Sequence, residues 1–221
     1  GWPGCRSRGD TLAGMRMPNP AGLTTTGCDP SGDPPNYPCI QGEPTDIQKD
    51  TTITDSSLTT VGDIPFDSLK QYATKTMLGG NVTVEPIATG GVCDTGVLTN
   101  WGEPWAVLGV PECRTYFPII WVEGNLNINK NRGQGVLIVN GDLNVQGSFE
   151  FYGPVLVRGT INTQGTGGHF NGGVIAANVN LDQNVVLGDA VINFSSCAVI
   201  KAVTASATAG LMRDRSWINL Y

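Results

Sequence analysis

Hydrophobic and polar residues follow a regular pattern from Ile119 onward and an irregular one before it. The later half contains the runs IIWVEGNLNI, VLIVNGDLNV, VLVRGTINT and VIAANVNL, in which apolar and polar positions alternate. Alternation with period two puts successive side chains on opposite faces of an extended strand. The pattern therefore predicts short β-strands that each turn one face to a core.

The four runs are copies of one repeat of 17 or 18 residues. Glycine stands at Gly124, Gly141 and Gly159, and Ala177 takes its place in the fourth copy. Just after this position, every copy carries an aliphatic residue followed by an asparagine. These residues are Leu126 and Asn127, Leu143 and Asn144, Ile161 and Asn162, and Val179 and Asn180.

A repeat of this length is too short for a helical repeat and fits one rung of a parallel β-solenoid with three short faces. One rung cannot bury its apolar side alone, so rungs stack and share a core. We expect the four aliphatic residues to form a buried ladder and the four asparagines an adjacent one, with amides hydrogen-bonded up the stack at a spacing of ~4.8 Å. The glycines are expected at corners. An antiparallel meander also explains the alternation, but not four asparagines in register.

The chain divides into two predicted parts, residues 1–117 and 118–221. Thirteen of the fourteen prolines lie at or before Pro118, and the first part reads as an irregular lobe closed by disulfides, although residues 1–25 fit a loose terminal arm equally well. Within it, PFDSLKQYATKTMLGG predicts a short helix over about 65–78, stopped by Gly79 and Gly80. The segment NVTVEPI predicts a strand.

The end of the chain predicts a cover for the solenoid, whose terminal strands would otherwise leave open edges. Ser195 and Ser196 are candidate N-caps of an Ala-rich helix, and Gly210 is a candidate stop. The predicted fold class is therefore mainly β: a short parallel β-solenoid with 17–18-residue rungs, a C-terminal capping helix and an irregular, disulfide-bearing N-terminal lobe.

The six cysteines contain no C-x-x-C pair, which argues against a zinc ribbon or a thioredoxin-type site. An even number in loop-rich sequence favours disulfides and an oxidising compartment, and buried free thiols in a cytosolic protein are the alternative. Proximity along the chain favours Cys28 with Cys39 and Cys93 with Cys113, which leaves Cys5 with Cys197.

Composition narrows the class of protein. The chain has 221 residues, of which 40% are hydrophobic and 14% charged, unlike a disordered chain. The net charge of −6 disfavours nucleic acid as a partner, because phosphates need a basic footprint. No stretch approaches the ~20 apolar residues of a membrane span, and the first residues contain no apolar core of a signal peptide.

The rungs GVLIVNGDLNVQGSFEFYGPVLVRG, the break VINFSSCAV and the tail RSWINLY resemble the C-terminal part of PilX-type pilus-assembly proteins, which are minor-pilin-like bacterial surface proteins. The resemblance spans about residues 118–221. It implies a bacterial cell-surface or extracellular location and pilin-like subunits as partners. Such proteins usually begin with a hydrophobic helix. This chain shows none, so we expect that helix to have been removed or to be supplied by a separate chain. A second resemblance, to the cytosolic solenoid polymers called bactofilins, conflicts with the cysteines and the proline-rich lobe.

Searching for catalytic chemistry yields no catalytic residue, metal site or cofactor. His169 is the single histidine, in GTGGHFNGG, and reads as a corner residue. Glu123 and Asp142 lie beside corner glycines, but Asn178 and Thr160 replace them downstream, so no acidic cluster builds up. The calcium-binding spacing is absent around Asp29 and Asp33.

Two functional hypotheses follow. The first is a non-catalytic extracellular structural protein, such as a pilin-like or filament subunit or a pilus-associated adhesive module, that acts by self-association or surface presentation. The second is a carbohydrate-binding or carbohydrate-active surface module, in which Trp101, Trp105 and Trp121 line a sugar site. A cytosolic polymer is a third, and it predicts free thiols.

Overall fold

The computed structural model describes residues 15–17, 47–53, 59–61, 64–105, 107–164, 168–180 and 191–206. This part of the chain is mainly β. The main sheet contains β5 (Lys75–Val82), β8 (Ile119–Ile128), β9 (Asn131–Gln134), β10 (Val136–Asn140), β11 (Leu143–Gln146), β12 (Phe149–Gln164), β13 (Gly168–Asn180) and β14 (Val191–Phe194). The other elements are β1 (Met15–Met17), β2 (Ile47–Lys49), β3 (Thr60–Val61), β4 (Ile64–Pro65), β6 (Ala88–Thr89), β7 (Val92–Cys93), the 3₁₀ helices η2 (Phe66–Tyr72) and η3 (Pro111–Cys113), and the α-helix α1 (Ser196–Ser206).

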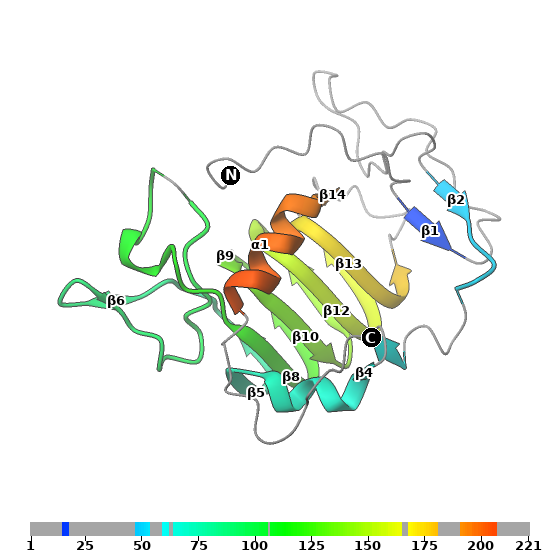
Figure 1. Cartoon of the computed structure of the whole chain (residues 1–221), viewed down its shortest axis with the longest axis horizontal. Coiled ribbons are helices and arrows are strands. Elements are labelled where there is room, and N and C mark those ends of the chain that lie inside the picture. The colour runs from blue at the N-terminus through cyan, green and yellow to red at the C-terminus, as the bar shows by residue number, and fades with distance from the viewer. Residues whose placement is uncertain are drawn as a thin grey trace, which may run out of the picture.

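The main sheet is a parallel β-solenoid of about 3 turns over residues 119–176. Each strand pairs in parallel with the equivalent strand of the next turn, so β8 pairs with β10 and β11, and these pair with β12, which pairs with β13. Figure 1 shows these strands side by side with α1 in front of them. The predicted solenoid is confirmed, and the antiparallel alternative is wrong.

The predicted aliphatic ladder forms the core on one side of each rung. Leu126 pairs with Leu143, Leu143 with Ile161, and Ile161 with Val179. Leu126, Leu143 and Ile161 are fully buried. On another side the aromatic rings of Phe149, Phe151 and Phe170 fill the core, so three faces of each rung meet in one hydrophobic cluster.

One further rung precedes those in the repeat. Strand β5 pairs in parallel with β8, which places Asn81 opposite Asn127 and Gly80 opposite Leu126. Only η2, which ends at Tyr72, corresponds to the helix expected over 65–78. The rest of that prediction is wrong, because Lys75–Val82 pairs with β8 as a strand instead. Gly79 and Gly80 therefore lie inside a strand and do not stop a helix. The predicted division of the chain between residues 117 and 118 stays a prediction. Strand β5, which belongs to the main sheet, lies before that point.

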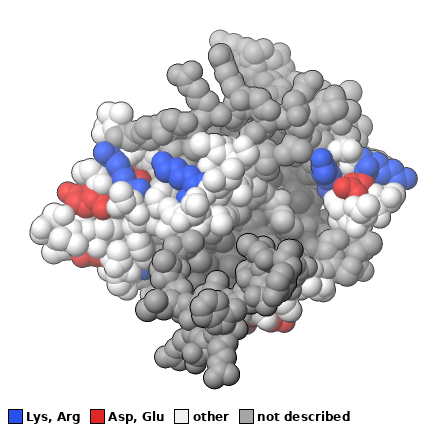
Figure 2. Space-filling view, in the orientation of Figure 1, with Lys and Arg blue, Asp and Glu red and all other residues white. Residues whose placement is uncertain are grey.

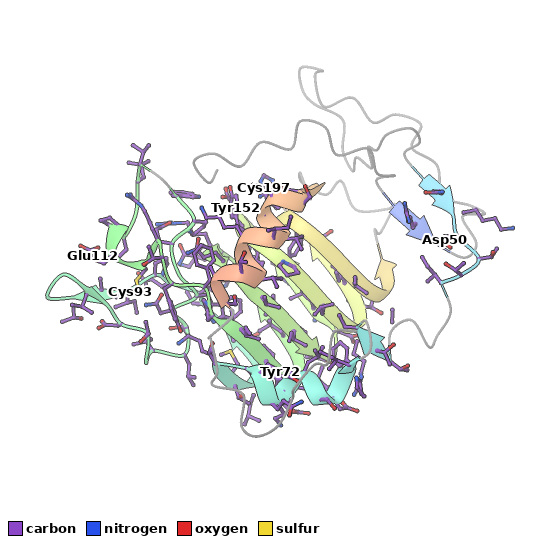
Figure 3. The ribbon with its side chains drawn as sticks, viewed as in Figure 1. Asp50, Tyr72, Cys93, Glu112, Tyr152 and Cys197 are labelled. Atoms are coloured by element: carbon purple, nitrogen blue, oxygen red, sulfur yellow. A yellow bond between two sulfur atoms is a disulfide. The ribbon has the colours of Figure 1, made fainter. Side chains whose placement is uncertain are left out.

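Two insertions interrupt this first rung and explain why the repeat is hidden. The chain leaves the solenoid after β5 and returns at Trp101, whose carbonyl accepts a hydrogen bond from the Gln134 N–H at 2.8 Å. It leaves again and returns at β8. The disulfide between Cys93 and Cys113 joins the two insertions, as predicted. Figure 3 shows Cys93 in the first insertion and Cys197 on α1. Cys197 is also disulfide-bonded, but Cys5, Cys28 and Cys39 lie outside the described residues.

Two helical segments cover the sides of the solenoid. Phe66 and Leu69 of η2 pack on Trp121, Ile138 and Leu156, which stand in register on the outer face of successive strands. The predicted C-terminal helix is confirmed as α1, and the Ser195 hydroxyl accepts a hydrogen bond from the Ala198 N–H at 3.2 Å, as an N-cap does.

Helix α1 lies across successive rungs and not on the last one alone. Its Ala198 and Ala202 pack with Phe117 and Tyr152. Figure 1 shows this helix crossing the strands of the solenoid. Figure 2 shows that charged side chains gather at two opposite sides of this face, with uncharged described residues between them.

The predicted corner glycines stack directly on one another. A Cβ built on Gly141 would lie 2.5 Å from the carbonyl carbon of Gly124, and one on Gly159 would lie 2.9 Å from the carbonyl oxygen of Gly141. The Gly159 N–H also donates to the Gly141 carbonyl at 3.0 Å. Stacked rungs thus come so close at this corner that no side chain fits between the backbones.

We predict that Gly141→Ala destabilises the protein by about 1–3 kcal/mol, because overpacking against backbone cannot be relieved by turning a side chain. Gly96→Ala is the matched control, since nothing lies within 4 Å of a Cβ at Gly96. Thermal unfolding followed by circular dichroism measures both. Equal melting temperatures for the two variants would contradict the stacked corner.

Candidate functional site

A ladder of asparagine side chains runs along the outer surface of the solenoid. The Nδ2 of Asn127 donates to Oδ1 of Asn81 at 3.1 Å. Asn144 donates to Asn127 and Asn162 donates to Asn144, each at 2.8 Å. Asn180 occupies the same register position opposite Asn162. The expected amide pairing is therefore confirmed up to Asn162, and it extends to Asn81, which the repeat spacing missed.

The asparagine ladder faces solvent, because each asparagine follows a buried aliphatic residue by one position and so points to the opposite side of the strand. Asn81 and Asn127 are exposed, and Asn144 and Asn162 are half-buried. Every bond has the same direction: the donor belongs to the later rung and the acceptor to the earlier one. The ladder thus has a polarity, with amide N–H groups of Asn81 at its N-terminal end.

We predict that Asn144→Leu lowers the free energy of unfolding by about 1 kcal/mol, because it removes two of the ladder's hydrogen bonds while water can still reach the amides that remain. Asn129→Leu is the control, since Asn129 is exposed and outside the ladder. Urea unfolding of both variants gives the comparison. An unchanged midpoint for Asn144→Leu would show that the ladder does not stabilise the fold.

The N-terminal edge of the solenoid is strand β5. Within the described residues β5 pairs with β8 alone, so its second edge has no strand partner. Thr76, Leu78 and Asn81 are exposed there, and 80% of the Leu78 surface is accessible. Lys75 differs: it is buried, and its ammonium donates to the carbonyls of Thr95 and Val97, so it holds the first insertion over the start of β5. Burial lowers the pKa of Lys75.

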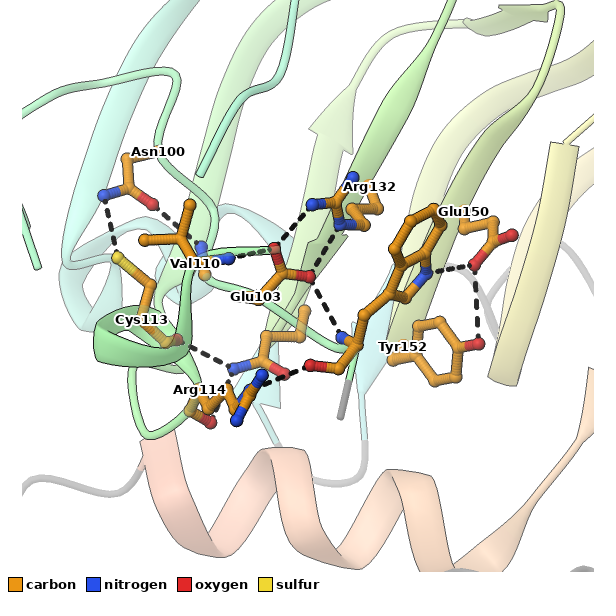
Figure 4. A network of polar contacts seen from close by, with 11 residues as sticks. Asn100, Glu103, Val110, Cys113, Arg114, Arg132, Glu150 and Tyr152 are labelled. Atoms are coloured by element: carbon orange, nitrogen blue, oxygen red, sulfur yellow. Dashed lines mark hydrogen bonds and ion pairs between the residues drawn. The ribbon is translucent and has the colours of Figure 1, made fainter. Parts of the chain in front are cut away.

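A buried carboxylate fixes the second insertion. The side chain of Glu103 is fully buried, and both of its oxygens accept hydrogen bonds from Arg132 at 2.6 Å. They also accept from the backbone N–H groups of Trp105 and Val110 (Figure 4). Burial raises the pKa of Glu103, but these hydrogen bonds outweigh it, so the pKa lies below its ordinary value. With its oxygens occupied, Glu103 acts as a structural anchor for the loop from Trp105 to Val110.

The same region shows where two of the three tryptophans considered for sugar binding lie. Trp101 is fully buried and packs edge-on against Phe149 and Phe151, in the space that Gly133 leaves free. Trp105 is half-buried, and the guanidinium of Arg132 lies 3.9 Å from its ring centroid.

Trp105 and Tyr152 meet at one carboxylate. The Nε1–H of Trp105 donates to Glu150 at 2.9 Å, and the Tyr152 hydroxyl lies 3.5 Å from the same oxygen (Figure 4). Burial, together with the charge of Glu150, raises the pKa of Tyr152 to about 12. His169 stands beside Glu150 in the register and is half-buried. Glu150 and Arg132 thus hold Trp105 against the solenoid.

Asp142 and Glu123, the two carboxylates beside corner glycines, have structural roles. Asp142 accepts a hydrogen bond from the Thr160 N–H at 2.8 Å, which ties one rung to the next. Glu123 accepts from Trp121 Nε1 at 2.8 Å, from Lys70 at 2.9 Å and from Asn140 at 2.7 Å. The third tryptophan, Trp121, is thus buried beneath η2, and Glu123 fastens that helix to the sheet.

A second ion pair joins η2 to the solenoid. Arg158 lies 2.7 Å from Asp67, and its guanidinium also lies 4.8 Å from the ring centroid of Phe66. The Arg158 guanidinium also donates to Asn140 at 2.7 Å, and Asn140 donates to Glu123. The ion pairs at Asp67 and at Glu123 therefore share one hydrogen-bond network. Polar contacts at the rim therefore surround the apolar contact between η2 and the sheet.

Hydrogen bonds from Trp121, Lys70 and Asn140 lower the pKa of Glu123 from 4.5 to about 2. A carboxyl with a depressed folded-state pKa stabilises the fold above its unfolded pKa, and the stabilisation disappears as the pH falls toward 2. We predict that Glu123→Gln lowers stability at pH 7 and that its difference from wild type shrinks between pH 4.5 and 2.

Chemical unfolding at a series of pH values tests this. Asp67→Asn is the comparison, since it removes the neighbouring ion pair at an exposed carboxylate. A difference between Glu123→Gln and wild type that does not change with pH would contradict the assignment.

Within the described residues, no group of three or more His, Cys, Asp and Glu side chains is placed to hold a metal ion. Among those residues, no helix has the length and apolar character needed to cross a membrane. Asp29 and Asp33, weighed as calcium ligands, lie outside them. No protein-family model, curated protein or solved structure matches the chain. The resemblance to PilX-type proteins therefore stays a prediction.

Sequence reasoning missed Asn81 and the pair of Glu103 and Arg132. Asn81 lies 46 residues before Asn127, where the later steps are 17 and 18 residues. Its local signal is the segment MLGGNV, in which glycine and asparagine precede an aliphatic residue much as in EGNLNI. The ion pair has no local signal, because its two residues meet only after the second insertion folds back.

Proposed function

We propose that this chain is a non-catalytic structural module of a bacterial surface filament or pilus, and that it acts by associating with copies of itself or with pilin-like subunits. One observation carries the proposal: a rigid parallel solenoid presents a strand edge, β5, with no strand partner in the described residues. Open strand edges pair readily with other chains, and native proteins usually blunt or cover them.

The way the rest of the molecule is built supports a mechanical role. The insertions are closed by the disulfide of Cys93 and Cys113 and by the buried ion pair of Glu103 and Arg132. Helix η2 is held by two ion pairs and an apolar cluster. Each device links segments far apart in the sequence and so restrains the solenoid at a different place. A disulfide also fits an extracellular location.

The carbohydrate hypothesis has less support. Trp101 and Trp121 are buried, and Arg132 lies against the ring of Trp105, so the three tryptophans do not form an open aromatic platform. Glu123, Asp142 and Glu150 are each engaged in hydrogen bonds that serve the fold. We therefore place self-association first and keep glycan binding as the competing outcome.

We predict that the purified protein forms oligomers whose size grows with concentration, because an edge contact between copies obeys mass action. Sedimentation velocity over a wide concentration range measures this, and glycan binding is assayed on the same preparation. A protein that stays monomeric at every concentration and binds a glycan would overturn the proposal. Electron microscopy of sheared cell-surface material, labelled with an antibody against residues 118–221, tests the location.

A further inference from the structure

We propose that copies join head to tail, with β5 of one copy pairing in parallel with the segment Val174–Asn180 of β13 in a second copy. This inference rests on the proposed self-association and names the contact that produces it. Both segments are terminal in the described sheet. Strand β14 pairs with β13 only over His169–Gly172, so within the described residues 174–180 pairs with β12 alone.

The polarity of the asparagine ladder selects this arrangement. Asn81 accepts from Asn127 through Oδ1, and its amide N–H groups have no acceptor in the described residues. A strand that continues the ladder below β5 offers an acceptor at that position in place of water. The C-terminal rung carries Asn180 at the ladder's register position, so head-to-tail stacking continues the ladder in its own direction. Pairing two β5 strands about a twofold axis would reverse the direction in the second copy.

A second set of outward-facing residues, in register on the face of the solenoid next to the asparagine ladder, also continues across the contact between copies. Within one chain it runs Thr76, Trp121, Ile138, Leu156 and Ile175. Helix η2 covers Trp121, Ile138 and Leu156, but Ile175 is 48% exposed at one end and Thr76 is exposed at the other. Stacking a second copy places Ile175 beside Thr76 and removes apolar surface from water. Leu78, which is 80% exposed, faces Ala177 when the register that sets Thr76 beside Ile175 continues by two residues.

Lys75 limits the contact to the later part of β5. Its ammonium is held by the carbonyls of Thr95 and Val97 and lies 5.5 Å from the ring centroid of Tyr116. The first insertion therefore occupies the start of the edge, and Thr76–Asn81 remains. A heterologous contact produces open chains when successive copies continue along one axis, as stacked rungs of a solenoid do.

The first test is a pair of cysteines, Thr76→Cys with Ile175→Cys. Within one chain these positions lie about four strand spacings, or roughly 19 Å, apart, too far for a disulfide. Between stacked copies they are neighbours at ~4.8 Å, within disulfide range. Oxidation of the double variant should give a ladder of linked oligomers on a non-reducing gel that collapses on reduction. Each single variant and the wild type should stay unlinked.

Each other outcome counts against the inference. Linked dimers from Thr76→Cys alone would indicate twofold pairing of β5. Absence of linkage in a folded double variant that still sediments as oligomers would overturn the head-to-tail contact and leave self-association intact. A wild type that is monomeric at all concentrations would overturn both this contact and the proposed self-association.

A second test does not depend on new cysteines. Asn81→Asp keeps an acceptor for Asn127 but removes the N–H groups at the ladder's free end. Asn129→Asp adds the same charge at an exposed position outside the ladder. We expect Asn81→Asp to weaken association about tenfold or more and Asn129→Asp to change it by less than about twofold. Equal effects of the two variants would overturn the role of the ladder.

Mixing the Asn81→Asp variant with wild type distinguishes the β5 end of the solenoid from its C-terminal rung. An Asn81→Asp copy still offers its C-terminal rung, so adding it to wild type should shorten the oligomers by capping one end. If pairing were twofold through β5, the variant would leave wild-type association unchanged.

Discussion

The in-register stacking of rungs, one strand spacing apart, is the constraint on which the rest of this structure depends. Backbone hydrogen bonds between parallel strands set the distance between rungs, and every corner must be crossed within it. At the corner of Gly124, Gly141 and Gly159 the successive backbones touch, so a side chain is excluded. The same spacing brings equivalent side chains together, which gives the aliphatic ladder inside and the asparagine ladder outside.

Stacking also creates the problem that the remaining elements solve. The strand that opens a repeat is apolar on both faces. In β8, for example, Ile120 points into the core and Trp121 points out of it. Helix η2 covers the outer side, and its ion pairs at Glu123 and Arg158 surround the apolar contact. The insertions in the first rung cover the start of β5 through Lys75 and fill the core with Trp101. What stays uncovered among the described residues is the later part of β5, and this edge is the basis of the functional proposal.

The proposed structural role and the polarity of the asparagine ladder are connected. Because each asparagine donates toward the N-terminal rung, the two ends of the solenoid are chemically different. Unlike ends favour contacts that repeat in one direction, as in a filament, over contacts related by a twofold axis. The disulfide and the buried ion pair hold the insertions that flank this edge, so the edge is presented in a fixed geometry.

The sequence by itself determined the solenoid, its rung length, the identity of the ladder residues in the repeated copies, the helix after Ser195 and one disulfide. These features depend on neighbours in the sequence or on a fixed spacing, and a fixed spacing becomes spatial adjacency when rungs stack. Only the tertiary structure decided that Lys75–Val82 is a strand, because its partner β8 lies beyond two insertions and its glycines locally favour a helix stop. The same holds for Glu103 and Arg132, whose pairing depends on how an insertion folds back, and for the unpaired edge of β5, which no local pattern records.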